Sequence, residues 1–114
     1  MPRYHLSLTP IDNGLYSAML MDTAMRWPIG FRSCRRTRIE GRAAIVGSST
    51  DGLPGWELTV RSAGEGMFQA DATDGRDWTI RFPECVLEQD DAGKRIEGWA
   101  EEAEIIEEKK GEAA

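Results

Sequence analysis

Short stretches in which apolar and polar residues alternate recur along this chain. Residues 4–9 (YHLSLT) alternate in this way, and so do residues 56–61 (WELTVR) and 78–82 (WTIRF). Alternation with a period of two is the pattern of a half-buried strand, because successive side chains point to opposite faces of a sheet. The apolar members of these stretches are therefore predicted to face a common core: Leu6, Leu8, Leu58, Val60, Ile80 and Phe82.

Turn-forming residues separate these stretches. Asp12-Asn13-Gly14 precedes the apolar run 15–21, which predicts a hairpin, and residues 64–66 (GEG) and 90–93 (DDAG) predict two more. Strands at intervals of roughly 8–12 residues are typical of antiparallel barrels and sandwiches. We therefore predict a mainly β chain: a small antiparallel barrel or sandwich of about six to eight short strands, to which one short helix near the C-terminus can be added.

Two segments fit either a strand or a helix. Residues 15–26 contain good helix formers, but we expect a strand to about Met21 and then a turn. Residues 98–109 continue a helical spacing of apolar residues, although a helix there would include Gly98 at a cost of about 1 kcal/mol. We expect a strand through about Trp99, followed by a helix or an irregular acidic segment.

The middle of the chain gives a weaker pattern. Pro28 lacks an amide donor and is expected to end the element before it. Residues 37–46 then form one apolar segment, which the turn-rich run 47–55 closes. Within this segment, residues 38–43 (RIEGRA) match residues 95–100 (RIEGWA) at five of six positions, at an offset of 57. The flanking residues do not extend the match, so we attribute it to convergent strand chemistry and not to a repeat.

The composition fits one soluble domain. A chain of 114 residues with 40% apolar and 30% charged residues is long enough to bury its own core, and we place one β-rich domain at residues 1–109 with a frayed tail at 110–114. No run approaches the ~20 apolar residues of a membrane span, and the N-terminus lacks the apolar core of a signal peptide. A cytoplasmic location without a membrane partner is predicted. In a reducing compartment, Cys34 and Cys85 are expected to be free thiols.

The residues that usually carry catalysis or bind metal ions are sparse. His5 is the only histidine, and no pair of residues has the spacing of a zinc site. Cys34 lies among arginines, which favour a thiolate, but no base neighbours it. Asp71, Asp74 and Asp77 do not match a calcium loop and are expected to form a solvated turn. We therefore predict a protein that is not an enzyme and has no metal or other cofactor.

Charge is divided unevenly along the chain. Residues 1–50 carry seven arginines and three acids, whereas residues 51–114 carry seventeen acids and seven bases, and the net charge is −6. A face of one sign steers an oppositely charged molecule toward it, so this division points to the choice of partner.

Five acids near the C-terminus define a predicted acidic face. We predict that the protein docks this face on the basic surface of a partner protein, as an inhibitor or sequestering protein of the immunity or anti-defence kind. The identity of the partner is not predicted. The face consists of Glu101, Glu102, Glu104, Glu107 and Glu108.

The arginine-rich segment 32–42 supports a first alternative. Arginine forks bind phosphate and aromatic rings stack on bases, so a small barrel with this segment has the chemistry of a single-stranded nucleic-acid binder. The net negative charge opposes nucleic-acid binding, and we expect these arginines to pair instead with the protein's own C-terminal acids or with an acidic protein patch. A barrel that encloses a small ligand is a second alternative. The residues of the predicted nucleic-acid site are Trp27, Phe31, Arg32, Arg35, Arg36 and Arg38.

Overall fold

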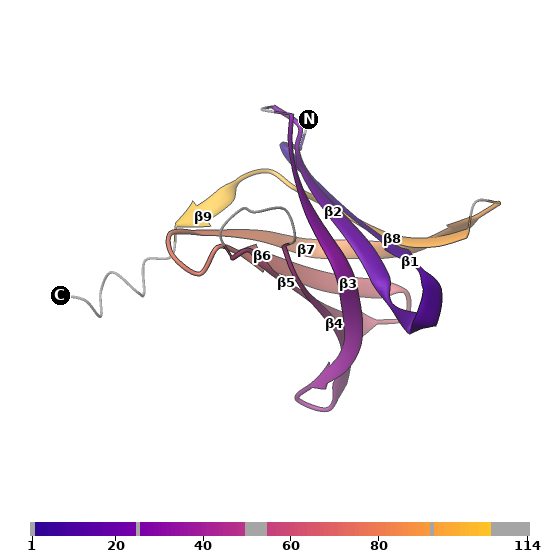
Figure 1. Cartoon of the computed structure of the whole chain (residues 1–114). Coiled ribbons are helices and arrows are strands. Elements are labelled where there is room, and N and C mark those ends of the chain that lie inside the picture. The colour runs from indigo at the N-terminus through magenta and orange to yellow at the C-terminus, as the bar shows by residue number, and fades with distance from the viewer. Residues whose placement is uncertain (1, 25, 50–54, 92, 106–114) are drawn as a thin grey trace.

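Strands β1 to β8 form a closed antiparallel barrel in the computed structural model, which describes residues 2–24, 26–49, 55–91 and 93–105 (Figure 1). Each strand pairs with the next one in the sequence, and β8 pairs with β1 to close the ring. A further strand, β9, lies outside the ring along the first residues of β7. The elements are β1 (Tyr4–Pro10), the 3-10 turn η1 (Asp12–Gly14), β2 (Tyr16–Asp22), β3 (Trp27–Ile39), β4 (Arg42–Ser48), β5 (Glu57–Gly64), β6 (Met67–Thr73), β7 (Trp78–Asp90), β8 (Gly93–Ala100) and β9 (Ala103–Ile105).

The predicted fold class is confirmed, because the chain is mainly antiparallel β and closes as a small barrel. The three predicted hairpins join β1 to β2, β5 to β6 and β7 to β8. Closure gives each of the eight strands two neighbours, which removes the exposed edges through which sheets aggregate. Within the described residues η1 is the only helical element, and the first residues of the predicted C-terminal helix contain β9 instead. Residues 106–109 of that prediction lie outside the described residues, and no described helix is long and apolar enough to cross a membrane.

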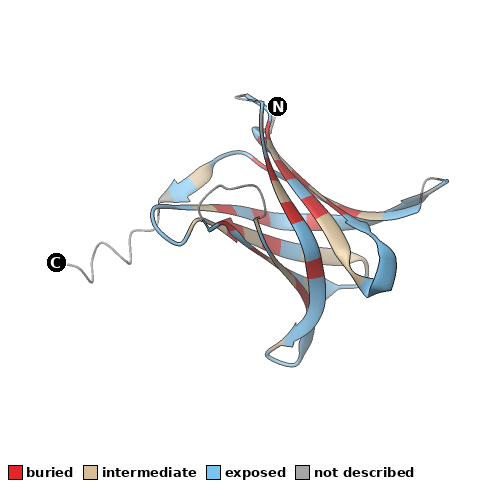
Figure 2. Cartoon of the chain, viewed as in Figure 1, coloured by how far each residue is buried: buried red, intermediate tan, exposed pale blue. Residues whose placement is uncertain are grey.

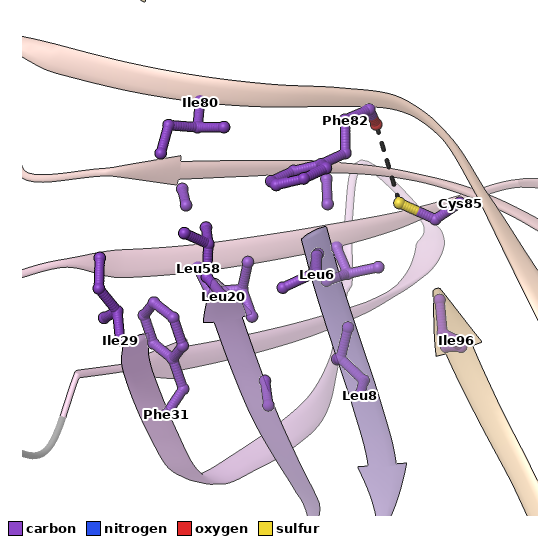
Figure 3. Packing of buried hydrophobic residues seen from close by; sticks show 14 of the residues in the cluster. Leu6, Leu8, Leu20, Ile29, Phe31, Leu58, Ile80, Phe82, Cys85 and Ile96 are labelled. Carbon is purple, nitrogen blue, oxygen red and sulfur yellow. Dashed lines mark hydrogen bonds between the residues drawn. The ribbon is translucent and has the colours of Figure 1, made fainter. Parts of the chain in front are cut away.

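The core fills the interior of the barrel. All six residues that the alternating pattern assigned to it are buried, with at most 3% of any of them exposed. In Figure 2 buried residues alternate with others along the strands, while the hairpin tips are exposed. Figure 3 shows side chains from β1, β2, β3, β5, β7 and β8 pointing into the same interior.

Residues 37–46, which the sequence pattern gave as one apolar segment, contain a turn between two strands. Strand β3 ends at Ile39, the chain turns at Glu40 and Gly41, and β4 starts at Arg42. Glu40 and Gly41 both have positive φ, at 52° and 79°, as a two-residue type I′ hairpin turn requires. The sequence pattern did not predict this turn, because the end of β3 is exposed on both faces and its residues do not alternate in polarity.

Two other sequence features have a structural explanation. Pro28 lies inside β3, in the part of the strand that pairs with β2 but not with β4. Proline is tolerated there because its missing amide donor is not needed for hydrogen bonds to a second neighbouring strand. The matching hexapeptides occupy different structures, because residues 38–43 span the β3–β4 turn and residues 95–100 lie within β8. They are therefore not equivalent parts of a repeat.

Candidate functional site

A different repeat relates the two halves of the barrel. Residues 27–34 (WPIGFRSC) and 78–85 (WTIRFPEC) share Trp, Ile, Phe and Cys at the same positions, at an offset of 51. The two motifs begin β3 and β7, which are the two 13-residue strands. Since β3 and β7 are four strands apart in a closed ring of eight, the halves β1–β4 and β5–β8 are related by half a turn about the barrel axis.

The buried ends of the two motifs are packed in the same way. The Sγ atom of Cys34 donates a hydrogen bond to the Phe31 carbonyl at 3.5 Å. In the second half, Cys85 Sγ donates to the Phe82 carbonyl at 3.9 Å, the dashed line in Figure 3. All four residues are fully buried. A glycine faces each sulfur, Gly47 in the first half and Gly98 in the second, again 51 residues apart. The barrel therefore consists of two copies of one four-stranded unit, and the gapped W-x-I-x-F-x-x-C motif is the sequence signal that reveals it.

The outer walls of the two halves differ in charge at equivalent positions. A hollow of about 440 Å³ on the wall of β3 and β4 is lined by Arg32, Ser33, Arg35 and Ser48, among others. The equivalent hollow on β7 and β8, of about 380 Å³, is lined by Pro83, Glu84, Val86, Glu88, Glu97 and Trp99. Arg32 and Arg35 correspond to Pro83 and Val86, while Ser33 and Ser48 correspond to Glu84 and Trp99. The first hollow thus contains two arginines and one carboxylate, Glu57, whereas the second contains three carboxylates and an aromatic ring.

We call the second of these surfaces the Trp99 wall; it consists of the six lining residues of the β7–β8 hollow together with His5. The indole of Trp99 is 51% exposed, the largest exposed fraction among the exposed large apolar residues of the described chain. The His5 ring stacks on it with centroids 4.0 Å apart, and His5 Nε2 lies 3.3 Å from a Glu97 carboxylate oxygen. These contacts place the His5 ring between the exposed Trp99 ring and a carboxylate of β8.

Two of the three carboxylates of the Trp99 wall form ion pairs with an arginine. Arg95 lies 3.2 Å from Glu88 and 3.3 Å from Glu97, so one guanidinium serves two acids. Glu84 forms no ion pair within the described residues. Three carboxylates against one arginine leave this wall with a net negative charge. The sequence analysis missed these acids because they are spread over two strands and meet only when β7 pairs with β8.

The predicted acidic face is only partly described. Glu101, Glu102 and Glu104 are exposed on the segment that leaves β8 and returns along β7. Glu104 lies 3.0 Å from Arg81, and Glu102 lines a hollow of about 480 Å³ at the barrel end that Arg3 and Asp22 flank. Glu107 and Glu108 lie outside the described residues.

The residues of the predicted nucleic-acid platform do not come together on one surface. Phe31 is fully buried in the core, so its ring is not available to stack on a base. Arg32 and Arg35 line the outer hollow, whereas Arg36 and Arg38 line a cavity at the end of the barrel. A residue with positive φ, Ser33 at 57°, interrupts the alternation of β3 and helps to distribute these arginines over two faces. Trp27 starts β3, but its side chain lies outside what the structure describes.

The expected pairing of these arginines with C-terminal acids is not found in the described part of the chain. The ion pairs there involve Arg3, His5, Arg61, Arg81 and Arg95. None of the arginines between residues 32 and 42 is among them. The arginines of the β3–β4 hairpin therefore form no ion pair with a described carboxylate, although Glu57 lines the same hollow as Arg32 and Arg35.

The remaining chemical groups have structural roles. Cys34 and Cys85 are free, buried thiols, and burial raises the pKa of Cys34 and raises that of Cys85 to about 11, so neither is poised as a thiolate nucleophile. Asp71 pairs with Arg61 at 3.1 Å. Asp74 accepts hydrogen bonds from three backbone amides of the β6–β7 turn, which outweigh its partial burial and lower its pKa. No group of three His, Cys, Asp or Glu residues within the described ranges is arranged to hold a metal ion.

Comparison with known proteins gives no relative: no family model, curated protein or solved structure matches this chain.

Proposed function

We propose that this protein is a non-catalytic binding protein that docks its Trp99 wall, together with the acidic segment after β8, on a basic surface of a partner protein. Occlusion of that basic surface is the proposed effect, so the protein acts as an inhibitor or a sequestering factor. A cytoplasmic setting is part of the proposal, since both cysteines are free thiols.

The exposed Trp99 ring among carboxylates is the observation that carries this proposal. Tryptophan and tyrosine are enriched at the centres of protein interfaces, where a rigid aromatic group contributes a large contact area. The face of an indole also attracts an arginine or lysine side chain, and Glu84 has no described cation of its own to neutralise it. A basic side chain of a partner is therefore complementary to this hollow in charge.

The overall charge supports the same kind of partner. At a net charge of −6, the protein attracts a basic molecule at long range and repels a polyanion. Exposed carboxylates at the rim of such an interface act mainly on the association rate, because they steer the encounter. Glu101, Glu102 and Glu104 are placed for this role at the end of β8, close in sequence to Trp99.

The test is a pull-down from nuclease-treated native lysate with three forms of the protein as bait. The test form carries Trp99→Ala and Glu84→Gln, and the matched control carries Ile11→Ala and Glu65→Gln, which remove one exposed apolar group and one acid from turns elsewhere. We expect the wild type and the control to retain the same basic protein, and the test form to lose it at moderate salt. Equal capture by all three forms would show that the Trp99 wall is not the docking surface.

Association and dissociation rates measured with the captured partner distinguish residues that steer the encounter from residues that contact the partner in the complex. Replacing Glu101, Glu102 and Glu104 by Gln is expected to slow association several-fold at low salt and to change dissociation much less. Trp99→Ala is expected to act mainly on dissociation, because it removes a contact made only in the complex. An association rate that is unaffected by these glutamates and by ionic strength would contradict the steering role.

A further inference from the structure

One end of the barrel contains a cavity of about 650 Å³. Most of its lining residues belong to β3, β4, β7 and β8. Figure 1 shows that the β3–β4 and β7–β8 hairpins extend beyond the rest of the ring. Its apolar lining includes Tyr16, Ile45, Phe68 and Ile96, of which Ile45 and Ile96 belong to the buried core. The volume falls in the range of roughly 300–1,000 Å³ that is usual for small-molecule sites. We call this cavity the basic mouth.

The described charged residues that line the basic mouth have a single sign. They are Arg36, Arg38, Lys94 and Arg95, and no described aspartate or glutamate side chain is among the lining residues. Arg95 is engaged with two glutamates on the outer wall, but Arg36, Arg38 and Lys94 form no ion pair within the described residues. In a protein with a net charge of −6, a cavity whose described charged residues are all cations is not explained by average composition. An anionic group of a ligand would pair with these cations.

Two contacts orient the arginines. The Arg36 guanidinium lies 5.9 Å from the centre of the Tyr16 ring, and Arg38 donates a hydrogen bond to the Gly41 carbonyl at 3.2 Å. These contacts leave further N–H groups of both guanidinium forks without described partners. Side chains two residues apart on one strand share a face, so the two forks lie on the same side of the cavity.

The two halves of the barrel show which features of the mouth are specific. At offsets of 51 or 52 residues, Ile45 corresponds to Ile96 and Tyr16 to Phe68, so both halves contribute the same apolar lining. Arg36, however, corresponds to Leu87, which also lines the cavity. The copies therefore share an apolar lining and differ on the rim, where β3 carries cations and β7 carries an apolar side chain.

From this arrangement we infer that the basic mouth binds a small amphipathic carboxylate, with its anionic head on Arg36 and Arg38 and its apolar body against Phe68 and Leu87. The inference is independent of the docking role of the Trp99 wall, because the two surfaces share none of these residues. It differs from nucleic-acid binding because the described aromatic residues of the mouth, Tyr16 and Phe68, form its apolar lining and do not project as a stacking platform.

The test uses decanoate as the probe and decanol as its neutral counterpart. Binding is measured by titration calorimetry, and amide chemical shifts locate the site. We expect decanoate to bind one site with shifts confined to the residues of the mouth, and decanol to bind at least about tenfold more weakly because it cannot pair with the arginine forks.

Variants on one strand provide a matched control. Arg36→Gln with Arg38→Gln is expected to weaken decanoate binding about tenfold or more, while Arg32→Gln with Arg35→Gln, which removes the same charge from the outer wall, is expected to leave it unchanged. All four arginines are exposed, so each variant is expected to fold.

Three outcomes would overturn the inference. The first is equal weakening by both pairs of variants, which would mean that total charge and not the mouth attracts the probe. The second is equal affinity for decanoate and decanol. The third is tighter, salt-sensitive binding of a short oligothymidylate that depends on all four arginines, which would assign this end of the protein to single-stranded nucleic acid.

Discussion

Two cysteine–glycine contacts determine how the barrel packs where β3 meets β4 and β7 meets β8. A Cβ atom added to Gly47 would lie 2.4 Å from Cys34 Sγ, and one added to Gly98 would lie 2.4 Å from Cys85 Sγ. Each pair therefore occupies space in which no further carbon fits, and glycine is required here by the neighbouring sulfur and not by its φ angle.

Replacing Gly98 by alanine is expected to destabilise the protein by about 1–3 kcal/mol, because the new methyl group overlaps the sulfur. Urea unfolding followed by circular dichroism measures this cost. The double variant with Cys85→Ala removes the sulfur, so it is expected to lose less stability than the two single variants added together. Strict additivity would show that the contact between the two residues does not limit packing.

The pKa of Cys85 also predicts how stability depends on pH. Burial raises this pKa from 9.0 to about 11 in the folded state, so above pH 9 the unfolded chain loses the thiol proton while the folded chain keeps it. The folded state then binds more protons, and its stability falls as pH rises from about 9 to about 11. Unfolding measurements across this window are expected to show a steeper decline for the wild type than for Cys85→Ala. Parallel curves would contradict the burial of this thiol.

The turn of the β3–β4 hairpin contains a residue in an unfavourable backbone conformation. Glu40 occupies a left-handed conformation with a φ of 52°, which side chains other than Asn, Asp and Gly adopt at a cost. The following Gly41, at 79°, suits the second position of a type I′ turn. The turn is nevertheless held in place, because Arg38 donates to the Gly41 carbonyl at 3.2 Å.

Glu40→Asn is expected to stabilise the protein by up to about 1 kcal/mol, because Asn-Gly is the preferred pair for this turn. Thermal unfolding measures the gain. Gly41→Ala serves as the opposite control and is expected to destabilise, since alanine is strained at a φ of 79°. A Glu40→Asn variant that melts at a lower temperature than the wild type would mean that the turn is not of this type.

On the scale of the whole molecule, the repeat of a four-stranded unit and the closure of the eight strands into a ring together determine the charged outer walls. Two copies of a four-stranded unit share a buried pattern of Ile, Phe, Cys and Gly, so their interiors match. Their exteriors differ in charge, with arginines on the wall of β3 and β4 and glutamates on the wall of β7 and β8.

The order of residues was sufficient to determine the class of fold and the burial of the core residues on the alternating strands. Strand alternation is a local property, so the burial of Leu6, Leu58 and Phe82 was predicted from their immediate neighbours. The β3–β4 turn was not predicted, because both faces of that hairpin are exposed and the local pattern is lost.

Only the tertiary structure decided which charged side chains meet. Glu84 and Trp99 come from different strands, and Arg36 and Lys94 come from opposite halves of the chain, so their proximity depends on strand register and on ring closure. The sequence showed a basic segment and an acidic segment, but the bulged strand β3 divided the basic segment between an outer wall and the barrel mouth. Side-chain direction in a sheet reverses with each residue, and a one-residue irregularity changes it for every residue that follows.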